Sequence, residues 1–204
     1  MIFTVAIDGP AAAGKGTISR AVAAEFGFAH LDTGLLYRAV GVKAAALGLD
    51  PAEVARGLQP SDLSGDLAGG DLRSLAAGQA ASRVAVIPAV RAALVAFQQR
   101  FARAPGGAVL DGRDIGTVIC PEAEVKIYVT ANPQIRAHRR WLEVGGAEAE
   151  VLAEVMRRDA RDMGRAEAPL RAADGAVVID TSDLSVQVAV AQAVAVVRAA
   201  LGQE

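Results

Sequence analysis

Short apolar runs are the first regularity along this chain. Four of them, at residues 2–8, 108–112, 125–131 and 176–182, are rich in aliphatic and β-branched side chains and end at or beside an acidic or hydroxyl residue. A shorter run at residues 29–33 is a fifth candidate. Nearly continuous hydrophobicity is typical of strands that are buried on both faces, as in parallel sheets. The pattern therefore predicts a five-stranded parallel sheet.

Apolar residues at helical spacing lie between these runs. One helical face is formed by Ile18, Val22 and Phe26. Gly27 would end that helix, because glycine is common at helix C-termini. A helix near the C-terminus would follow a cap at Ser182 or Asp183. Its apolar stripe consists of Val186, Val190, Val194, Val197 and Leu201. Strands that alternate with helices predict an α/β fold with helices on both faces of the sheet.

Two segments depart from this alternation. Residues 57–81 are rich in Gly, Ser and Asp without a strand pattern, and are interpreted as a loop with short helical pieces. Residues 157–175 continue a helix and then become small, charged and proline-containing. A chain of 204 residues, 52% hydrophobic, can bury a substantial core, and we expect a single domain over residues 1–204.

Composition narrows the classes of partner. A formal net charge of -2 argues against a nucleic-acid partner, since such proteins usually carry a basic excess. No apolar run approaches the roughly 20 uncharged residues of a membrane span. Cys120 is the only cysteine, so no intrachain disulfide can form. We expect a cytoplasmic protein without a nucleic-acid or membrane partner.

The stretch GPAAAGKGT carries the strongest chemical signal. It nearly fits the phosphate-loop pattern G-x-x-x-x-G-K-[ST], but Gly16 follows Lys15 and the hydroxyl arrives at Thr17. A strand, a glycine-bounded loop and a helix N-terminus together form an anion site. Lys15 would meet the β- and γ-phosphates of a nucleotide, and Thr17 would reach phosphate or Mg²⁺. The expected nucleotide-binding residues are Gly9, Pro10, Ala11, Ala12, Ala13, Gly14, Lys15, Gly16 and Thr17.

Ligands of doubly wound sheets bind at the carboxyl ends of the strands. Four acids fall at such ends: Asp8, Asp32, Asp111 and Asp180. Asp111 could support Mg²⁺ through water, although buried strand ends also use such acids structurally.

Three further motifs are ambiguous when each is taken alone. LDTGLLYR, with Thr33 and Arg38, fits an acceptor site or a capped helix with a surface arginine. ASRVAVIPAVR, with Ser82 and Arg91, fits ligand recognition or plain helix packing. VLDGRDIGTVICP places Asp111, Arg113 and Asp114 in one turn, which a structural salt bridge would also explain.

A cluster of arginines follows near the end of the chain. On a helix, Arg158, Arg161, Asp162 and Arg165 share one face. Phosphoryl transfer needs positive charge around the transferred group, so this face could belong to a mobile lid. The alternative is a solvated face with internal Asp–Arg pairs.

In this order, the motifs GPAAAGKGT, LDTGLLYR, SRVAVIPAVR, DGRDIGTVICP and RRDARDMGRAEAPL resemble bacterial cytidylate kinases over nearly the whole chain. The resemblance implies a P-loop kinase fold, with residues 57–81 as a shortened acceptor-binding insert and residues 157–175 as the lid region. It implies transfer of the γ-phosphoryl group of Mg-ATP to CMP or dCMP by a monomer.

The resemblance also implies roles for matched residues. Ser82, Arg91 and Asp114 would read the cytosine. The acceptor phosphate would be held by Arg38 and Arg113, with Thr33 close by. Asp162 would touch the sugar hydroxyls. The remaining implied catalytic residues are Lys15, Arg158 and Arg165, and the implied metal contacts are Thr17 and, through water, Asp111.

The chain departs from the family at two places, which keeps alternatives open. The insert lacks the small antiparallel sheet of many bacterial members, and Thr33 replaces a serine. A kinase for UMP or AMP and a non-catalytic nucleotide-binding module remain alternatives. A GTPase-like switch is disfavoured, since none of the lysines has Asp two positions later. His30 and His138 have no partner at a useful spacing and are left outside the site.

Overall fold

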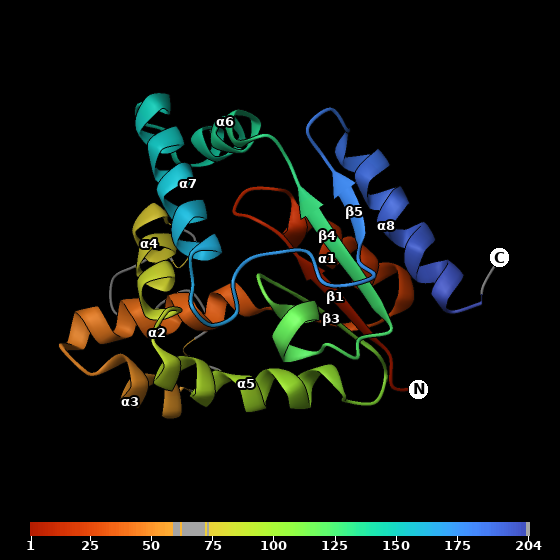
Figure 1. Cartoon of the computed structure of the whole chain (residues 1–204), viewed down its shortest axis with the longest axis horizontal. Helices are drawn as coiled ribbons and strands as arrows, with labels where there is room; N and C mark the ends of the chain where they lie inside the picture. The colour runs from red at the N-terminus through yellow and green to blue at the C-terminus, as the bar shows by residue number, and fades with distance from the viewer. Residues whose placement is uncertain (59–61, 63–71, 73, 203–204) are drawn as a thin grey trace. The chain divides into compact units, whose positions relative to one another are not determined.

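The structure is a computed structural model that describes residues 1–58, 62, 72 and 74–202 (Figure 1). Contacts divide the chain into two compact units, one formed by Met1–Leu31 with Gln99–Glu204 and the other by Asp32–Gln98. Each unit has its own packing, and the single domain expected over residues 1–204 stays a prediction.

The sheet contains the five strands expected from the sequence. They are β1 (Thr4–Asp8), β2 (Ala29–Asp32), β3 (Ala108–Gly112), β4 (Val125–Thr130) and β5 (Val177–Asp180). Their order is β2-β3-β1-β4-β5, and the pairs β1–β3, β1–β4 and β4–β5 are parallel. Asp8 pairs with Gly112 on one side and Tyr128 on the other. The ends of β1, β3 and β4 therefore lie at one edge, as predicted for a ligand site.

Burial on both faces holds for β1 and β3. All five residues of β1 and of β3 are buried. In β5 the side chains of Val177 and Val178 are 42% and 58% exposed. The expectation of continuous burial is therefore wrong for the edge strands β2 and β5. It is also wrong for β4, in which buried and half-buried residues alternate.

Helices α1 (Lys15–Phe26) and α8 (Val186–Ala200) pack together and share a hydrophobic core with the sheet (Figure 1). Ile18 and Val22 are buried in this core, Phe26 packs against it, and Gly27 ends α1 with φ +67°. These features confirm the predicted helix.

The predicted cap and stripe of α8 need correction. Ser185, not Ser182 or Asp183, is the N-cap, and its hydroxyl accepts a hydrogen bond from Val188 N–H at 3.2 Å. Ser182 is used elsewhere, since its hydroxyl accepts from Asn132 N–H. Within the predicted stripe only Val186 departs, since it is 59% exposed. Val197 is buried in the core, and Val190, Val194 and Leu201 pack against it.

The remaining elements of the first unit follow the inner strands. After β3 comes a π-helical turn, η2 (Ile115–Ile119), and after β4 come α6 (Pro133–Val144) and α7 (Glu148–Met163), which pack against each other. Asn132 caps α6 and accepts a hydrogen bond from Gln134 N–H at 2.9 Å. Cys120, which follows η2, is a free, buried thiol.

The second unit is helical. It contains α2 (Thr33–Leu47), α3 (Pro51–Arg56), α4 (Leu75–Val84) and the start of α5 (Pro88–Ala102). Helices α2 and α4 pack closely where Gly41 has no side chain. A Cβ on Gly41 would lie 2.8 Å from the carbonyl carbon of Ala80. Most of the predicted insert, residues 57–81, lies outside the described residues, and its last seven residues belong to α4.

Among the described residues no single helix is both long and apolar enough to cross a membrane. One bent pair, Leu75–Val84 with Pro88–Ala102 at 101°, passes that test by length and composition alone.

Candidate active site

The glycine loop after β1 has the backbone of a tight anion-binding turn. Gly9 has φ +150°, and a Cβ there would lie 1.9 Å from the Val129 carbonyl oxygen, so only glycine fits. Ala12 has φ +59°, a left-handed conformation that L-residues rarely adopt. Gly14, at φ +94°, leads into Lys15, the first residue of α1. The loop thus delivers the positive end of a helix to the sheet edge.

Lys15 lies over this loop instead of extending into solvent. Its side chain is 6% exposed, and its Nζ donates a hydrogen bond to the Pro10 carbonyl oxygen at 2.8 Å. Its charge also acts on the carboxylate of Asp8. The ammonium is therefore held at the loop, as the sequence predicts for a phosphate-binding lysine.

Asp8, at the end of β1, fixes the turn after β3. Its two carboxylate oxygens accept hydrogen bonds from Ile115 N–H at 2.8 Å and Gly116 N–H at 2.7 Å. Burial raises the pKa of Asp8 to about 6, and the nearby Asp114 adds to that rise, while the two N–H groups and Lys15 oppose it. Asp8 thereby ties the glycine loop to the turn that carries Arg113 and Asp114.

Three arginines gather around the buried carboxylate of Asp162, which is 1% exposed. Arg113 Nε lies 2.9 Å from one carboxylate oxygen and Arg165 Nη2 lies 2.5 Å from the other. Arg158 Nε is 3.9 Å away. Burial opposes ionisation, but the guanidinium groups of Arg113, Arg165 and Arg158 hold the pKa of Asp162 below its usual range. Three cations around one anion leave an excess of positive charge.

This cluster confirms part of the predicted helical face. Arg158 and Asp162 lie on α7, but α7 ends at Met163, so Arg165 reaches Asp162 from beyond the helix. The internal Asp–Arg pairs of the alternative interpretation do occur. They are not on a solvated face, however, because Asp162 is buried.

His30 has a partner that the sequence did not reveal. Its Nε2 lies 2.8 Å from Asp111 Oδ2, between the adjacent strands β2 and β3. The expectation that His30 lacks a partner is therefore wrong. His138 pairs with Glu148 at 2.8 Å, and both side chains are half exposed, so this pair lies on the surface.

Thr17 and Asp111 have the chemistry of Mg²⁺ contacts. Thr17 is exposed in the first turn of α1, and Asp111 contributes a carboxylate that is 5% exposed. Both offer the hard oxygen ligands that Mg²⁺ prefers. Within the described part of the chain, no group of three or more His, Cys, Asp or Glu residues could hold an ion alone. The residues fit an ion held largely by substrate phosphates and water.

The other predicted acceptor residues lie in the second unit. Thr33 begins α2 and is 3% exposed, while Arg38, on the same helix, donates from Nη1 to the Leu72 carbonyl oxygen at 2.8 Å. Ser82 on α4 and Arg91 on α5 are 2% and 5% exposed. Arg38 is half-buried, which argues against a plain surface arginine. The burial of Ser82 and Arg91 fits ligand recognition and helix packing alike.

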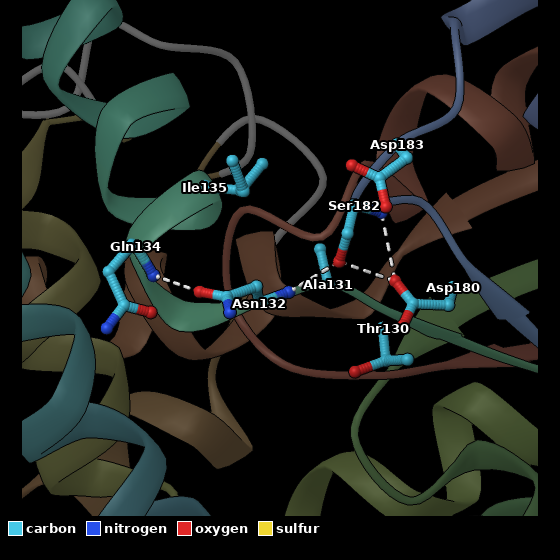
Figure 2. A pocket seen from close by; sticks show the side chains of 8 residues that line it. All are labelled: Thr130, Ala131, Asn132, Gln134, Ile135, Asp180, Ser182 and Asp183. Atoms are coloured by element: carbon cyan, nitrogen blue, oxygen red, sulfur yellow. Dashed lines mark hydrogen bonds between the residues drawn. The ribbon is translucent and has the colours of Figure 1, made fainter.

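A cavity of about 710 Å³, which the sequence analysis missed, lies at the ends of β4 and β5. Figure 2 shows its two polar rims, one formed by the start of α6 and the other by the turn after β5. Thr181, within that turn, donates a hydrogen bond to the Ala13 carbonyl oxygen of the glycine loop at 3.0 Å. The cavity is lined by Thr130, Ala131, Asn132, Gln134, Ile135, Asp180, Ser182 and Asp183.

Comparison with solved structures supports the fold. An uncharacterized protein from Eubacterium ventriosum superposes with a TM-score of 0.58 at 13% identity, covering 93% of this chain and 94% of that chain. A gluconokinase from Sinorhizobium meliloti superposes with a TM-score of 0.53 at 14% identity, covering 98% and 95%. These neighbours agree with the predicted P-loop kinase fold.

Sequence comparison is more specific. A cytidylate kinase of Cereibacter sphaeroides is 65% identical over 211 residues, and one of Rhizobium meliloti is 52% identical over 212 residues; both alignments cover 100% of each chain. The family model described as Cytidylate kinase matches residues 5–199. This chain belongs to the cytidylate kinase family.

Proposed function

We propose that this protein transfers the γ-phosphoryl group of ATP to CMP and dCMP. The observation that carries the proposal is the presence, in one compact unit, of a phosphate loop with a buried lysine and of three arginines around Asp162. The relatives named cytidylate kinase support the choice of acceptor.

On the donor side, residues 9–17 would surround the ATP phosphates. The N–H groups at the start of α1 are oriented toward an anion, and Lys15 places its ammonium at the loop. Phosphoryl transfer demands positioning and positive charge more than covalent help. Lys15 would therefore stabilise the charge that develops on the transferred group.

Mg²⁺ would be held by the Thr17 hydroxyl and, through water, by the Asp111 carboxylate. When bound, the ion would neutralise negative charge on the ATP phosphates. His30 Nε2, 2.8 Å from Asp111 Oδ2, would help to orient this carboxylate.

The cavity beside the loop would hold the base and sugar of ATP. Its volume falls within the range of roughly 300–1,000 Å³ that small-molecule sites occupy. Asp180 and Asp183 supply carboxylate acceptors and Asn132 supplies an amide. Its connection to Ala13 through Thr181 places this cavity next to the phosphate loop.

On the acceptor side, the arginines around Asp162 would bind phosphate. Each guanidinium has five N–H donors, so Arg113, Arg158 and Arg165 can bind Asp162 and phosphate oxygens together. Asp162 would contact the sugar hydroxyls of the acceptor. Arg38 would join Arg113 on the acceptor phosphate, with Thr33 near it.

Base recognition would come from Ser82, Arg91 and Asp114. All three are at most 5% exposed, and a buried polar residue that pairs with a base discriminates strongly against bases lacking the matching group. The lid role of residues 157–175, the monomeric state and the cytoplasmic location stay predictions.

The test is ADP production by the purified protein with Mg-ATP and either CMP, dCMP, UMP or AMP. A marked preference for CMP and dCMP is expected. If UMP is used as well as CMP, the protein does not discriminate between these acceptors, and the shortened insert would explain the loss. If ATP binds tightly but no acceptor is phosphorylated, the chain is a nucleotide-binding module and the proposal is wrong. The Lys15→Met variant should lose turnover, which links any activity to the glycine loop.

A further inference from the structure

The glycine loop contains a strained peptide unit whose conformation needs support. Ala12 has φ +59°, and within the described residues only Ala168 is another non-glycine residue with positive φ. A side chain with a Cβ makes this conformation unfavourable, so the surrounding structure must hold it.

Arg136, a residue absent from the predicted site, contacts this peptide unit directly. It lies on α6 and is 3% exposed. Its Nη1 donates to the Ala11 carbonyl oxygen at 3.1 Å, and its Nε donates to the Ala131 carbonyl oxygen at 2.8 Å. The guanidinium is planar and rigid, so these bonds fix its orientation as well as its position.

Asp159 on α7 compensates the buried charge of Arg136. The pair is bidentate, with Nη1 to Oδ1 at 3.1 Å and Nη2 to Oδ2 at 2.5 Å. A buried guanidinium without such a partner would be strongly destabilising. Because Asp159 is next to Arg158, the same pair also connects the loop to the helix that carries Arg158 and Asp162.

The contact with Ala11 has a consequence for the next residue. The Ala11 carbonyl and the Ala12 N–H belong to one planar peptide and point in opposite directions. Holding the carbonyl toward Arg136 therefore turns the Ala12 N–H away from α6. In a phosphate loop the backbone N–H groups grip the phosphates.

We propose that Arg136 is a positioning residue that holds the Ala11–Ala12 peptide in its left-handed conformation, so that the Ala12 N–H can bind a donor phosphate. Arg136 acts through the loop and does not itself touch the reacting atoms. This inference rests on the proposed assignment of the loop to ATP.

Calorimetric titration tests the proposal. Mg-ATP and CMP are each titrated into proteins with and without Arg136→Met, once with Ala12 and once with Ala12→Gly. Mg-ATP binding should weaken by about tenfold or more, the scale of one lost charge-assisted hydrogen bond, with CMP binding nearly unchanged. Glycine adopts φ +59° without strain. The loss in the Ala12→Gly background should therefore be smaller, about threefold or less, because the two sites are coupled.

The control variants separate the possible failures. Arg198→Met removes an exposed cation paired with Glu25 and should leave ATP binding unchanged. If Lys15→Met binds ATP normally, the assignment of the loop is wrong. The positioning role is wrong if Lys15→Met loses ATP binding and Arg136→Met does not. It is also wrong if Arg136→Met weakens ATP binding equally in the Ala12 and the Ala12→Gly backgrounds. If Arg136→Met does not fold, Arg136→Lys replaces it. This variant keeps the positive charge but lacks the planar guanidinium. Its loss of ATP affinity should likewise be smaller in the Ala12→Gly background.

Discussion

At the scale of single residues, Asp8 should make folding depend on pH. Burial raises its pKa from 3.8 to about 6, so the folded chain holds the Asp8 proton more tightly than the unfolded chain. The stabilisation is complete below about pH 4 and is lost as the pH rises through about 6. Relative to Asp8→Asn, the wild type should lose about 3 kcal/mol of unfolding free energy over that range.

Urea unfolding of both proteins at steps between pH 4 and pH 7.5 measures this difference. The other titrating groups contribute almost equally to both proteins, so their contributions largely cancel in the difference. Asn also replaces one acceptor oxygen with an amide, which cannot accept from both Ile115 and Gly116 N–H. That cost is independent of pH, so a constant offset between the two proteins, without a slope, would contradict the role of Asp8.

Asp162 should show the opposite sign. The guanidinium groups of Arg113, Arg165 and Arg158 hold its pKa below the usual range, so its stabilisation is present above about pH 4 and is lost as the pH falls through the lowered value. Asp162→Asn leaves a buried cluster of cations without its anion, and should cost about 3 kcal/mol of stability at pH 7.

The unfolding free energy of Asp162→Asn at pH 7 and at pH 3 checks this expectation. The destabilisation should shrink at the lower pH, since the carboxylate of the unfolded wild-type chain then takes up a proton more readily than the folded one. A matched variant, Asp183→Asn, removes an acid for which no ion pair is found in the described residues and should change stability little. Equal losses in the two variants would show that the arginine cluster contributes nothing.

The limits of sequence analysis are clearest at this scale. Lys15 could be found because it is one of only three lysines and lies in a local motif. His30 and Asp111 are 81 residues apart, and Arg136 and Ala11 are 125 residues apart, so only the folded sheet brings each pair together. Arginine accounts for most of the positive charge of the chain, so the sequence does not distinguish Arg136 from the other arginines.

At the scale of helices and strands, the hydrophobic pattern was sufficient to locate all five strands and the end of α1. It could not identify the sheet edge, since the valines of β5 resemble those of an inner strand until the pairing order is known. It also misplaced the cap of α8. Three hydroxyl or acidic residues, Ser182, Asp183 and Ser185, precede that helix, and the choice depends on which side chain is engaged elsewhere.

The contact between α2 and α4 gives a prediction for an element pair. A Cβ on Gly41 would lie 2.8 Å from the Ala80 carbonyl carbon and 2.9 Å from its Cβ, so Gly41→Ala must separate the helices. Overpacking of this kind costs about 1–3 kcal/mol. Thermal unfolding should show a clearly lower melting temperature for Gly41→Ala.

Gly57→Ala is the matched control within the same unit. Its backbone has φ -95°, and the nearest atom to a new Cβ would be the Glu53 carbonyl oxygen at 3.6 Å, an ordinary contact. Its melting temperature should stay close to that of the wild type. A similar fall for both variants would mean that the tight approach at Gly41 is not what limits this unit.

At the scale of the whole molecule, the residues proposed for ATP all lie in the first unit, whereas those proposed for the acceptor come from both units. The glycine loop, the cavity and the Asp162 cluster belong to the first unit, whereas Ser82 and Arg91 belong to the second. Variants of the second unit should therefore alter the use of the acceptor without altering the use of ATP. The motifs that contain Ser82 and Arg91 lie in the second unit, which supports a role of this unit in CMP recognition. Most of the predicted insert lies outside the described residues.

Ser82→Ala and Arg91→Met are expected to raise the KM for CMP by about tenfold or more, the scale of a lost hydrogen bond in a buried polar site, while the KM for ATP stays within about twofold. Because these residues would read the cytosine, the loss should be larger for CMP than for UMP. Arg83→Met, an exposed neighbour on α4, is the matched control and should behave as the wild type. Steady-state ADP production with each nucleotide varied in turn measures the KM values for CMP, UMP and ATP. Equal losses for CMP and UMP would show that Ser82 and Arg91 support the fold or the phosphate contacts, and that the base is recognised elsewhere.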